Sequence, residues 1–248
     1  ENPVLDGTHG GTRTDYTVRV EVCTSTFRTD CKLYPNGKYK PVGILHDYGE
    51  NESMLFGLLT GSYDKNMSGG ILRKVVSSFK GEINATTGQF TSGATIVKNL
   101  NNLRIRDFNN GGTKYFYRKG SFRTGIMPEG DYVDWGNPIG EMMYEALRYY
   151  AGKSTPTAAY THSTSPNDKA VGLTFATWDD PYAATSAAKA QWCAKPNMLV
   201  MSSTAISYDS DQLPGSAFGS FTGDLTGLNV SALGDTITAG EQIGRAHV

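Results

Sequence analysis

The sequence lacks the residue patterns that mark the common metal-dependent and nucleotide-dependent enzymes. Its four histidines are scattered along the chain and no Cys-x-x-Cys pair is present, so a zinc site is not expected. Neither a Gly-x-Ser-x-Gly elbow nor a Gly-x-x-x-x-Gly-Lys-Ser/Thr loop occurs. We therefore expect no catalytic residue, no bound cofactor and no enzyme activity in these 248 residues.

An excess of charge of one sign and long apolar runs are also missing. Lysine and arginine number 23 against 24 aspartates and glutamates, for a net charge of −1. Nucleic-acid binding needs a concentrated basic face, so nucleic acid is not an expected partner. No apolar stretch approaches the roughly 20 residues of a membrane-spanning helix. The 29 glycines, with frequent serine, threonine and asparagine, are typical of long polar loops in extracellular bacterial proteins.

Cysteine is scarce too, with three residues. Cys23 and Cys31 are separated by seven residues at the end of a predicted strand. A disulfide between them would close a small loop, add roughly 2–3 kcal/mol of stability and indicate a compartment outside the cytoplasm. The alternative is a pair of free thiols. Cys193 is left over, and we expect it to be buried or bonded to a partner outside the chain.

Four segments have the patterns of strands. Residues 15–23 and 71–78 alternate apolar and polar side chains, as half-buried strands do. Residues 54–59 and 197–202 are continuous apolar runs of the length expected for buried strands.

Helical patterns lie between these strands, at residues 42–49, 94–108, 137–151 and the alanine-rich stretch 183–191. Strands that alternate with helices predict a largely parallel sheet covered by helices on both faces.

The segment 137–151 is the best-defined helix in the sequence. Asn137 is predicted as its N-cap, Pro138 as its first helical residue and Gly152 as the left-handed residue that ends it. Its apolar residues recur at helical spacing and form a stripe that we expect to be buried against a sheet. The stripe consists of Ile139, Met142, Met143, Ala146, Leu147 and Tyr150.

A pair of carboxylates is the strongest local candidate for chemistry. Asp209 and Asp211 flank Ser210, and such a pair suits a glycosyltransferase-like metal site or an oxygen-ligand calcium loop. The alternative is that both carboxylates are solvated in a polar loop.

Eight segments together resemble a known family: residues 19–23, 31–43, 54–59, 69–73, 82–88, 135–152, 195–200 and 207–215. In this order they closely resemble the PilC/PilY family of type IV pilus assembly proteins and tip-associated adhesins of Gram-negative bacteria. The resemblance covers about residues 16–216. It implies an α/β fold with a von Willebrand factor A-like (Rossmann-like) core and long insertions, from the amino-terminal region of such a protein.

The resemblance also implies a function and a location. It implies an exported, non-enzymatic protein at the outer membrane, cell surface or pilus tip, which assists pilus assembly or surface adhesion. The expected partners are pilin or minor pilins and a host-cell or abiotic surface, and nothing in the chain is expected to span a membrane.

A metal site is part of the implied fold. Such domains bind metal through an Asp-x-Ser-x-Ser loop, a threonine and a later aspartate. In this chain Asn137 takes the threonine position and Ser203 takes the aspartate position, and the loop itself is absent. We therefore expect no tight metal site, with Asn137, Asp209 and Asp211 as weak candidates. Calcium or magnesium is expected, if at all, in the full-length protein.

Both ends of the chain have unusual sequences. The chain starts without methionine, and residues 243–248 resemble a translated sequencing adapter. We therefore expect residues 1–242 to be a partial von Willebrand factor A-like region, truncated at both ends, and residues 243–248 to be a non-native tail.

A second function remains open from the residues alone. Asp209 and Asp211 could serve a secreted glycan-processing or hydrolytic enzyme. A deep cleft with two carboxylates at catalytic separation would favour that enzyme.

Overall fold

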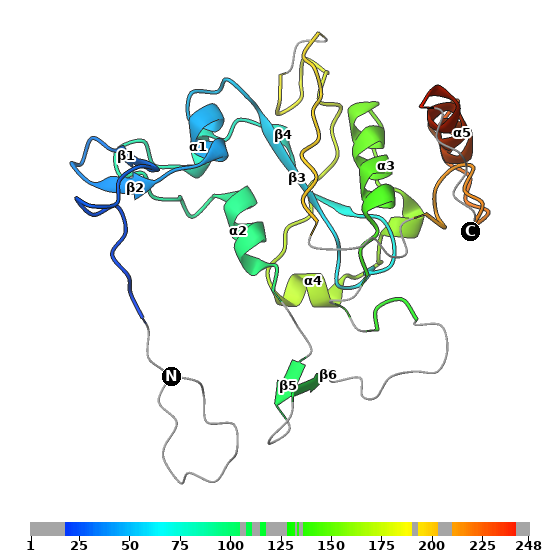
Figure 1. Cartoon of the computed structure of the whole chain (residues 1–248), viewed down its shortest axis with the longest axis horizontal. Coiled ribbons are helices and arrows are strands. Elements are labelled where there is room, and N and C mark those ends of the chain that lie inside the picture. The colour runs from blue at the N-terminus through cyan, green and yellow to red at the C-terminus, as the bar shows by residue number, and fades with distance from the viewer. Residues whose placement is uncertain are drawn as a thin grey trace. The chain divides into compact units, whose positions relative to one another are not determined.

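A computed structural model describes residues 18–104, 108–110, 115–117, 128–131, 133, 136–189, 193–202 and 210–241 (Figure 1). The chain divides into two compact units. The first unit is Glu1–Phe56 with Ser78–Met127, and the second is Gly57–Ser77 with Pro128–Val248.

The first unit is built from short elements. Strands β1 (Cys31–Leu33) and β2 (Tyr39–Pro41) form an antiparallel pair, with Cys31 opposite Pro41. The turn between them contains Gly37, whose φ of +76° is readily adopted only by glycine. Helix α1 (Ile44–Gly49) follows and confirms the helix predicted at 42–49.

The aromatic ring of Phe79 forms the centre of this unit. Phe79 has no exposed surface, and Phe56 packs edge-on against it with ring centroids 5.9 Å apart. Gly49 lies so close to this ring that a Cβ there would come within 2.7 Å of it. Glycine at the end of α1 therefore allows the helix to reach the aromatic core.

Helix α2 (Thr95–Asn102) begins where predicted but ends six residues early. Its first turn is held by the buried Glu82, in the one-turn helix η1 (Lys80–Glu82), whose carboxylate accepts the Ile96 N–H at 3.0 Å. Phe108, predicted as helical, lies instead in β5 (Phe108–Asn110).

Strand β5 pairs antiparallel with β6 (Tyr115–Tyr117). Asn101 and Asn102 at the end of α2 have low helix propensity, because their side chains compete for nearby backbone groups. The helix therefore stops short of the predicted end.

The second unit contains the sheet and helices that position the candidate site. Strands β3 (Phe56–Thr60) and β4 (Ile71–Ser77) pair in a two-stranded sheet and confirm two predicted strands. The helical elements that follow are α3 (Ile139–Tyr150), the one-turn η2 (Ala158–Tyr160), α4 (Pro166–Ala170) and α5 (Val230–Gly240). None of the described helices is long and apolar enough to cross a membrane.

Helix α3 confirms the predicted helix but not its predicted start. Pro138 is the N-cap and Asn137 lies one residue outside the helix, with no side-chain cap in place. The C-terminus matches the prediction: Gly152 has φ +74° and donates to the Tyr149 carbonyl, while Lys153 donates to the Arg148 carbonyl. This pair of bonds is the Schellman motif.

The buried face of α3 also differs from the prediction. The apolar stripe is not the core face, because Met143 and Leu147 are exposed and the other stripe residues are half-buried. The fully buried side chains come from the neighbouring face, which carries Glu141, Glu145 and Arg148. Those charged groups have hydrogen-bond partners that make burial tolerable.

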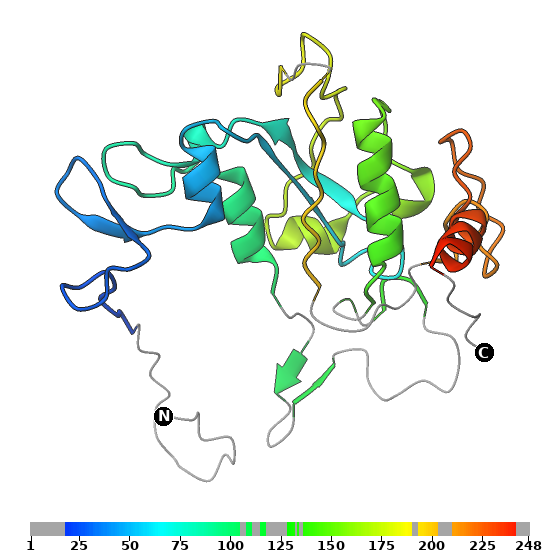
Figure 2. The ribbon, with the colours of Figure 1, turned by 45° about the horizontal axis from the view of Figure 1, so that its top comes forward.

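An extended segment, residues 193–202, runs beside α3 in both views (Figures 1 and 2). The prediction of a buried strand at 197–202 is wrong in two respects. This segment is in no ladder among the described residues, and the side chains of Met198, Leu199, Val200 and Met201 are exposed.

Two further predictions fail. Residues 18–23 are not a strand, and their valines are exposed because no described strand pairs with them. Residues 183–189 form successive turns instead of a helix. There the Ser186 hydroxyl donates to the Pro181 carbonyl and accepts the Lys189 N–H, so this side chain competes with helical bonds.

The fold class is therefore mixed α/β. The described residues contain three two-stranded sheets and no continuous parallel sheet.

Candidate functional site

The most unusual region of the second unit is the buried polar face of α3, formed by Glu141, Glu145 and Arg148. Spacings of four and three residues place these side chains on one side of the helix. Glu141 and Glu145 have no exposed surface, and Arg148 is 6 % exposed. Burial of charge is costly unless each group is paired and hydrogen-bonded, so the partners of each group decide what this face can do.

Glu145 is held by its neighbours on both oxygens. Oε1 accepts the Thr157 N–H at 2.8 Å, and Oε2 accepts the Thr157 hydroxyl at 2.6 Å and Arg148 Nη1 at 3.0 Å. Burial raises the pKa of Glu145, and the bonds from Thr157 and Arg148 oppose that shift. The carboxylate thus fixes the segment that follows α3 onto the helix.

Arg148 extends this network toward solvent. Its Nε and Nη2 donate to the two oxygens of Asp224 at 2.8 and 2.9 Å, a bidentate pair. The Arg148 guanidinium holds the pKa of Asp224 well below its usual range. Tyr144 donates its hydroxyl to the same carboxylate at 3.2 Å, so a segment 76 residues after Arg148 is tied to the helix.

Glu141 binds two backbone amides from distant parts of the unit. Oε2 accepts the Gly69 N–H at 2.6 Å and Oε1 accepts the Gln212 N–H at 3.0 Å. Burial raises the pKa of Glu141 to about 7, the two amides oppose the shift, and the nearby charges of Asp211 and Glu129 add to it. Glu141 therefore joins the β3–β4 connection to the segment after residue 210.

A second buried ion pair lies between β4 and α4. Arg73 Nη2 and Asp168 Oδ2 are 2.8 Å apart, and neither side chain has exposed surface. Asp168 also accepts the Tyr63 N–H and the Ser62 hydroxyl. Arg73 donates further to the Thr60 hydroxyl and to the carbonyls of Gly61 and Thr174. Every charged atom thus has a partner, as a buried pair requires.

The weak candidate Asn137 is placed beside the extended segment. Its Nδ2 donates to the Ser202 hydroxyl at 2.8 Å. Ser203, the next residue, and Asp209 lie outside the described residues. Asn137 therefore contacts Ser202, the residue before Ser203. The family resemblance aligns Ser203 with a metal-binding aspartate.

Asp211 lies elsewhere in the second unit. It is exposed, and with Gln212, Phe218 and Phe221 it lines an open surface hollow. No group of three or more His, Cys, Asp or Glu side chains suited to a metal ion occurs within the described ranges.

The residues at the implied metal position do not fit a hard divalent cation. An amide and serine hydroxyls are weaker ligands than the carboxylates that calcium and magnesium prefer. The described contact of Asn137 at this position is also made by its amide nitrogen, which is a donor and not a ligand. The expectation of no tight site there stays a prediction.

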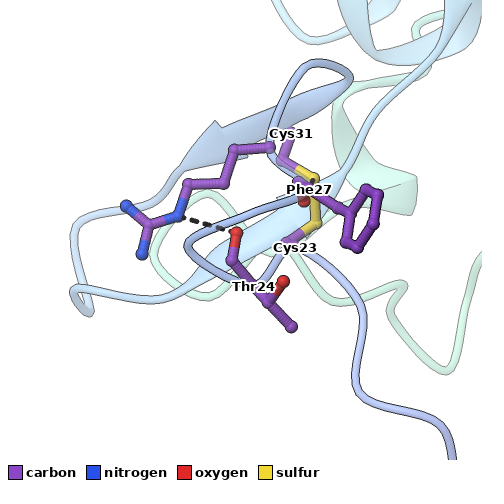
Figure 3. The surroundings of a disulfide bond; sticks show 5 residues. Cys23, Thr24, Phe27 and Cys31 are labelled. Atoms are coloured by element: carbon purple, nitrogen blue, oxygen red, sulfur yellow. Dashed lines mark hydrogen bonds between the residues drawn. A yellow bond between two sulfur atoms is a disulfide. The ribbon is translucent and has the colours of Figure 1, made fainter.

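In the first unit, a disulfide joins Cys23 to Cys31, with the two Cα atoms 5.9 Å apart (Figure 3). The loop that it closes is also held by Arg28, whose Nε donates to the Thr24 carbonyl at 3.1 Å. Cys193 is a free and exposed thiol, so the expectation that it is buried is wrong. Its bonding to a partner outside the chain stays a prediction.

The buried polar face of α3 was missed because hydropathy was used to choose the core face. A signal was present in the sequence, since Glu141, Glu145 and Arg148 recur at the spacing of one helix face. That signal is usually produced by a solvated face, and only the partners from loops distinguish the two cases.

Comparison with known proteins identifies the family of the chain. Residues 56–248 match a family model described as "PilY1 homolog, second domain". The chain is 42% identical over 264 aligned residues to a curated Xylella fastidiosa (strain Temecula1) protein named type IV pilus biogenesis factor PilY1 homolog. The alignment covers 97% of this chain and 18% of that protein. No solved structure matches. The chain belongs to the PilY1 family of type IV pilus proteins.

Proposed function

We propose that this chain is part of an exported, non-enzymatic protein of the type IV pilus system, which assists pilus assembly or adheres to surfaces at the pilus tip. The observation that carries the proposal is the 42% identity, over 97% of the chain, to a protein named as a pilus biogenesis factor. The chain spans about a fifth of that relative, so the activity and partners of the whole protein are part of the proposal.

The use of the buried acidic groups supports a non-enzymatic role. Glu145 and Asp168 are surrounded by donors on both oxygens, so they are committed to holding loops in place. A general acid or nucleophile must instead reach a substrate. Asp211 is exposed on an open hollow without a second described carboxylate lining it.

The disulfide supports export. Disulfides form and persist in oxidising compartments such as the periplasm and the cell surface, and are rare in the cytoplasm. Cys23–Cys31 is therefore consistent with a location at the outer membrane, cell surface or pilus tip. Pilin or minor pilins and a host-cell or abiotic surface are the proposed partners.

We also propose a von Willebrand factor A-like core for the second unit. Two features support it: an apolar extended segment lies along α3, and that segment ends beside Asn137, at the start of the helix. Calcium or magnesium would then belong to the full-length protein and not to this chain.

A genetic experiment tests the function. The natural gene is deleted and complemented with the wild type, with Arg73→Met or with the double variant Asp209→Ala/Asp211→Ala. Surface pili, twitching motility and adhesion are then measured. We expect loss of all three in the deletion strain, severe loss with Arg73→Met because it leaves Asp168 buried without its partner, and little effect of the double variant.

A catalytic assay separates this proposal from the enzyme alternative. The purified protein is incubated with glycans and esters. Hydrolysis that disappears in Asp209→Ala/Asp211→Ala, with normal pili in that strain, would replace the pilus proposal with the enzyme.

A further inference from the structure

A surface groove lies in the first unit, between the end of β2, helix α1 and the turn at residues 88–90. Helix α1 lies beside the β1–β2 hairpin in both views (Figures 1 and 2). The groove has a volume of about 540 Å³, within the range of about 300–1,000 Å³ that is typical of ligand sites. Its lining includes Lys40, Pro41, Val42, His46, Gln89 and Phe90.

The floor of the groove is aromatic and uncharged. The His46 ring packs against Phe90 with ring centroids 5.5 Å apart, and against Phe79 with centroids 6.5 Å apart. Burial lowers the pKa of His46, so its ring is neutral at pH 7. Phe90 is nevertheless 46 % exposed. A large aromatic ring exposed in a concave surface is suited to anchor an apolar side chain.

The turn that carries Phe90 is held in place by its own contacts. Gly88 lies so close to the buried Tyr34 ring that a Cβ there would come within 2.4 Å of it. The Gly88 N–H donates to the Asn84 carbonyl at 2.8 Å, and the Asn84 N–H donates to the Gln89 carbonyl at 2.8 Å. A preformed wall of this kind loses little conformational entropy when a partner binds.

The backbone of Phe90 has hydrogen-bonding groups to spare. Phe90 and Ile83 form an isolated antiparallel bridge, with backbone bonds on either side of this pair and not within it. The N–H and C=O groups of Phe90 therefore point away from Ile83. Among the described residues, neither group has a hydrogen-bond partner. Such groups are the partners that an extended peptide uses when it binds along an exposed backbone edge.

The charged group of the groove, Lys40, is left without an opposite charge. No carboxylate is part of the groove lining, and Lys40 makes no ion pair within the described ranges. Lys32 lies opposite Lys40 in the β1–β2 pair. Glu50, at the C-terminus of α1, is already bound to Lys32 and to the Tyr34 hydroxyl. This side of the groove therefore attracts an acidic group.

We propose that this groove binds an extended acidic segment of a separate polypeptide, with an apolar side chain against Phe90 and a nearby carboxylate at Lys40. The neutral floor accommodates the apolar side chain, the free groups of Phe90 bind the main chain, and Lys40 selects the charge. The groove holds only a few residues, so we expect weak, reversible binding. Such binding does not depend on the pilus role proposed above.

Binding of labelled peptides to the complete protein, expressed from the whole natural reading frame, tests the proposal. The probe is the fluorescent peptide Asp-Val-Asp-Phe-Asp-Val-Asp, and its binding is measured by fluorescence anisotropy. The matched control is the same peptide with lysine in place of every aspartate. We expect saturable binding of the acidic peptide and at least about tenfold weaker binding of the lysine peptide, because Lys40 repels it. Equal affinities, or no binding of the acidic peptide, would overturn the proposal.

Variants of the protein show where the acidic peptide binds. We expect Phe90→Ala to weaken binding about tenfold, since it removes the apolar anchor. Lys40→Met should weaken it about threefold and reduce its dependence on salt. Phe27→Ala and Lys38→Met are the matched controls, because both side chains are exposed in the same unit outside the groove lining, and each should change affinity by less than about twofold. Unchanged affinity in Phe90→Ala and Lys40→Met would contradict the proposed site.

Thiol labelling distinguishes a separate polypeptide from other occupants of the groove. Gln89→Cys, at an exposed residue of the lining, is made in a Cys193→Ser background, which removes the exposed free thiol. We expect maleimide to label the complete protein rapidly, and about tenfold more slowly when the acidic peptide is present at about ten times its Kd. Slow labelling without peptide would assign the groove to another part of the same polypeptide, and protection that grows with protein concentration would assign it to a second copy. Either result would overturn the proposal.

Discussion

Two regions of the second unit, a set of buried charged side chains and an exposed apolar segment, are inverted relative to hydropathy. Arg73, Asp168, Glu141 and Glu145 have about 1 % or less exposed surface, whereas the apolar segment 198–201 is exposed. The charged groups are buried because loops from distant parts of the chain supply donors and acceptors for them. The apolar segment is exposed because no part of the described chain covers its side chains. In these two regions burial follows the availability of partners and not the polarity of the side chain.

The largest loss of stability is expected when the buried Arg73–Asp168 ion pair is broken. This change tests most directly whether the buried charges depend on their partners. Arg73→Met leaves Asp168 as an uncompensated buried charge, so we expect a loss of about 3–5 kcal/mol in unfolding free energy, measured by urea denaturation. Lys169→Met, at an exposed cation on the same helix as Asp168, is the control and should change stability by less than about 0.5 kcal/mol. Equal effects of the two changes would mean that the pair does not hold the fold.

The disulfide should give the next largest effect, in the first unit. Cys23→Ser with Cys31→Ser removes a constraint on the unfolded chain and should lower stability by roughly 2–3 kcal/mol under oxidising conditions. Peptide mapping without reductant should show the two cysteines linked in exported protein. Two separately alkylated thiols in periplasmic material would contradict this expectation.

Glu141 should make stability depend on pH. Its pKa is raised to about 7 in the folded protein from 4.5 in the unfolded chain, so the folded state binds its proton more tightly. This contribution to stability is therefore fully present below about pH 4.5 and is lost as pH rises to about 7, on the order of 3 kcal/mol.

His46 contributes the opposite slope in part of this range, because burial lowers its pKa. The measurement is therefore the difference between the wild type and Glu141→Gln, from thermal melts between pH 4.5 and 8. We expect the wild type to lose more stability across this range than the variant. Parallel curves would show that Glu141 does not titrate in this window.

Leu147→Asp should have the smallest effect on stability. It tests whether the apolar stripe of α3 is exposed. A buried apolar stripe would make this change severe, but Leu147 is 40 % exposed. We expect a loss below about 1 kcal/mol by urea denaturation. A loss of several kcal/mol in the complete protein would mean that other parts of the polypeptide cover this side of α3.

The sequence predicts local elements better than the core. Strands β3 and β4, helices α1 and α3 and the Gly152 terminus follow from periodicity and turn chemistry, which act over a few residues. Helix α5 was not predicted, although the Asn229 side chain caps it by accepting the Ala232 N–H. The threonines and glycines of that segment weaken the helical pattern, so the cap was the clearer signal.

The candidate site could be predicted only in part, for a physical reason. Asn137 was predicted as the N-cap of α3 but lies one residue before the N-cap Pro138, and its contact with Ser202 joins residues 65 apart. The partners of Glu141 lie 72 and 71 residues away, and Asp168 lies 95 residues from Arg73. Periodicity within one element carries no information about which distant loop will supply a donor.

The disulfide has a mechanical consequence. Tension applied to the chain on the amino-terminal side of Cys23 passes through the sulfur atoms directly to Cys31, the first residue of β1. The seven residues between the cysteines carry none of that load and cannot be stretched. Eight residue steps of roughly 3.5 Å would otherwise span about 28 Å, against the 5.9 Å between the linked Cα atoms. The oxidised chain is therefore shorter under load by about 22 Å, a length that reduction would release in a single step.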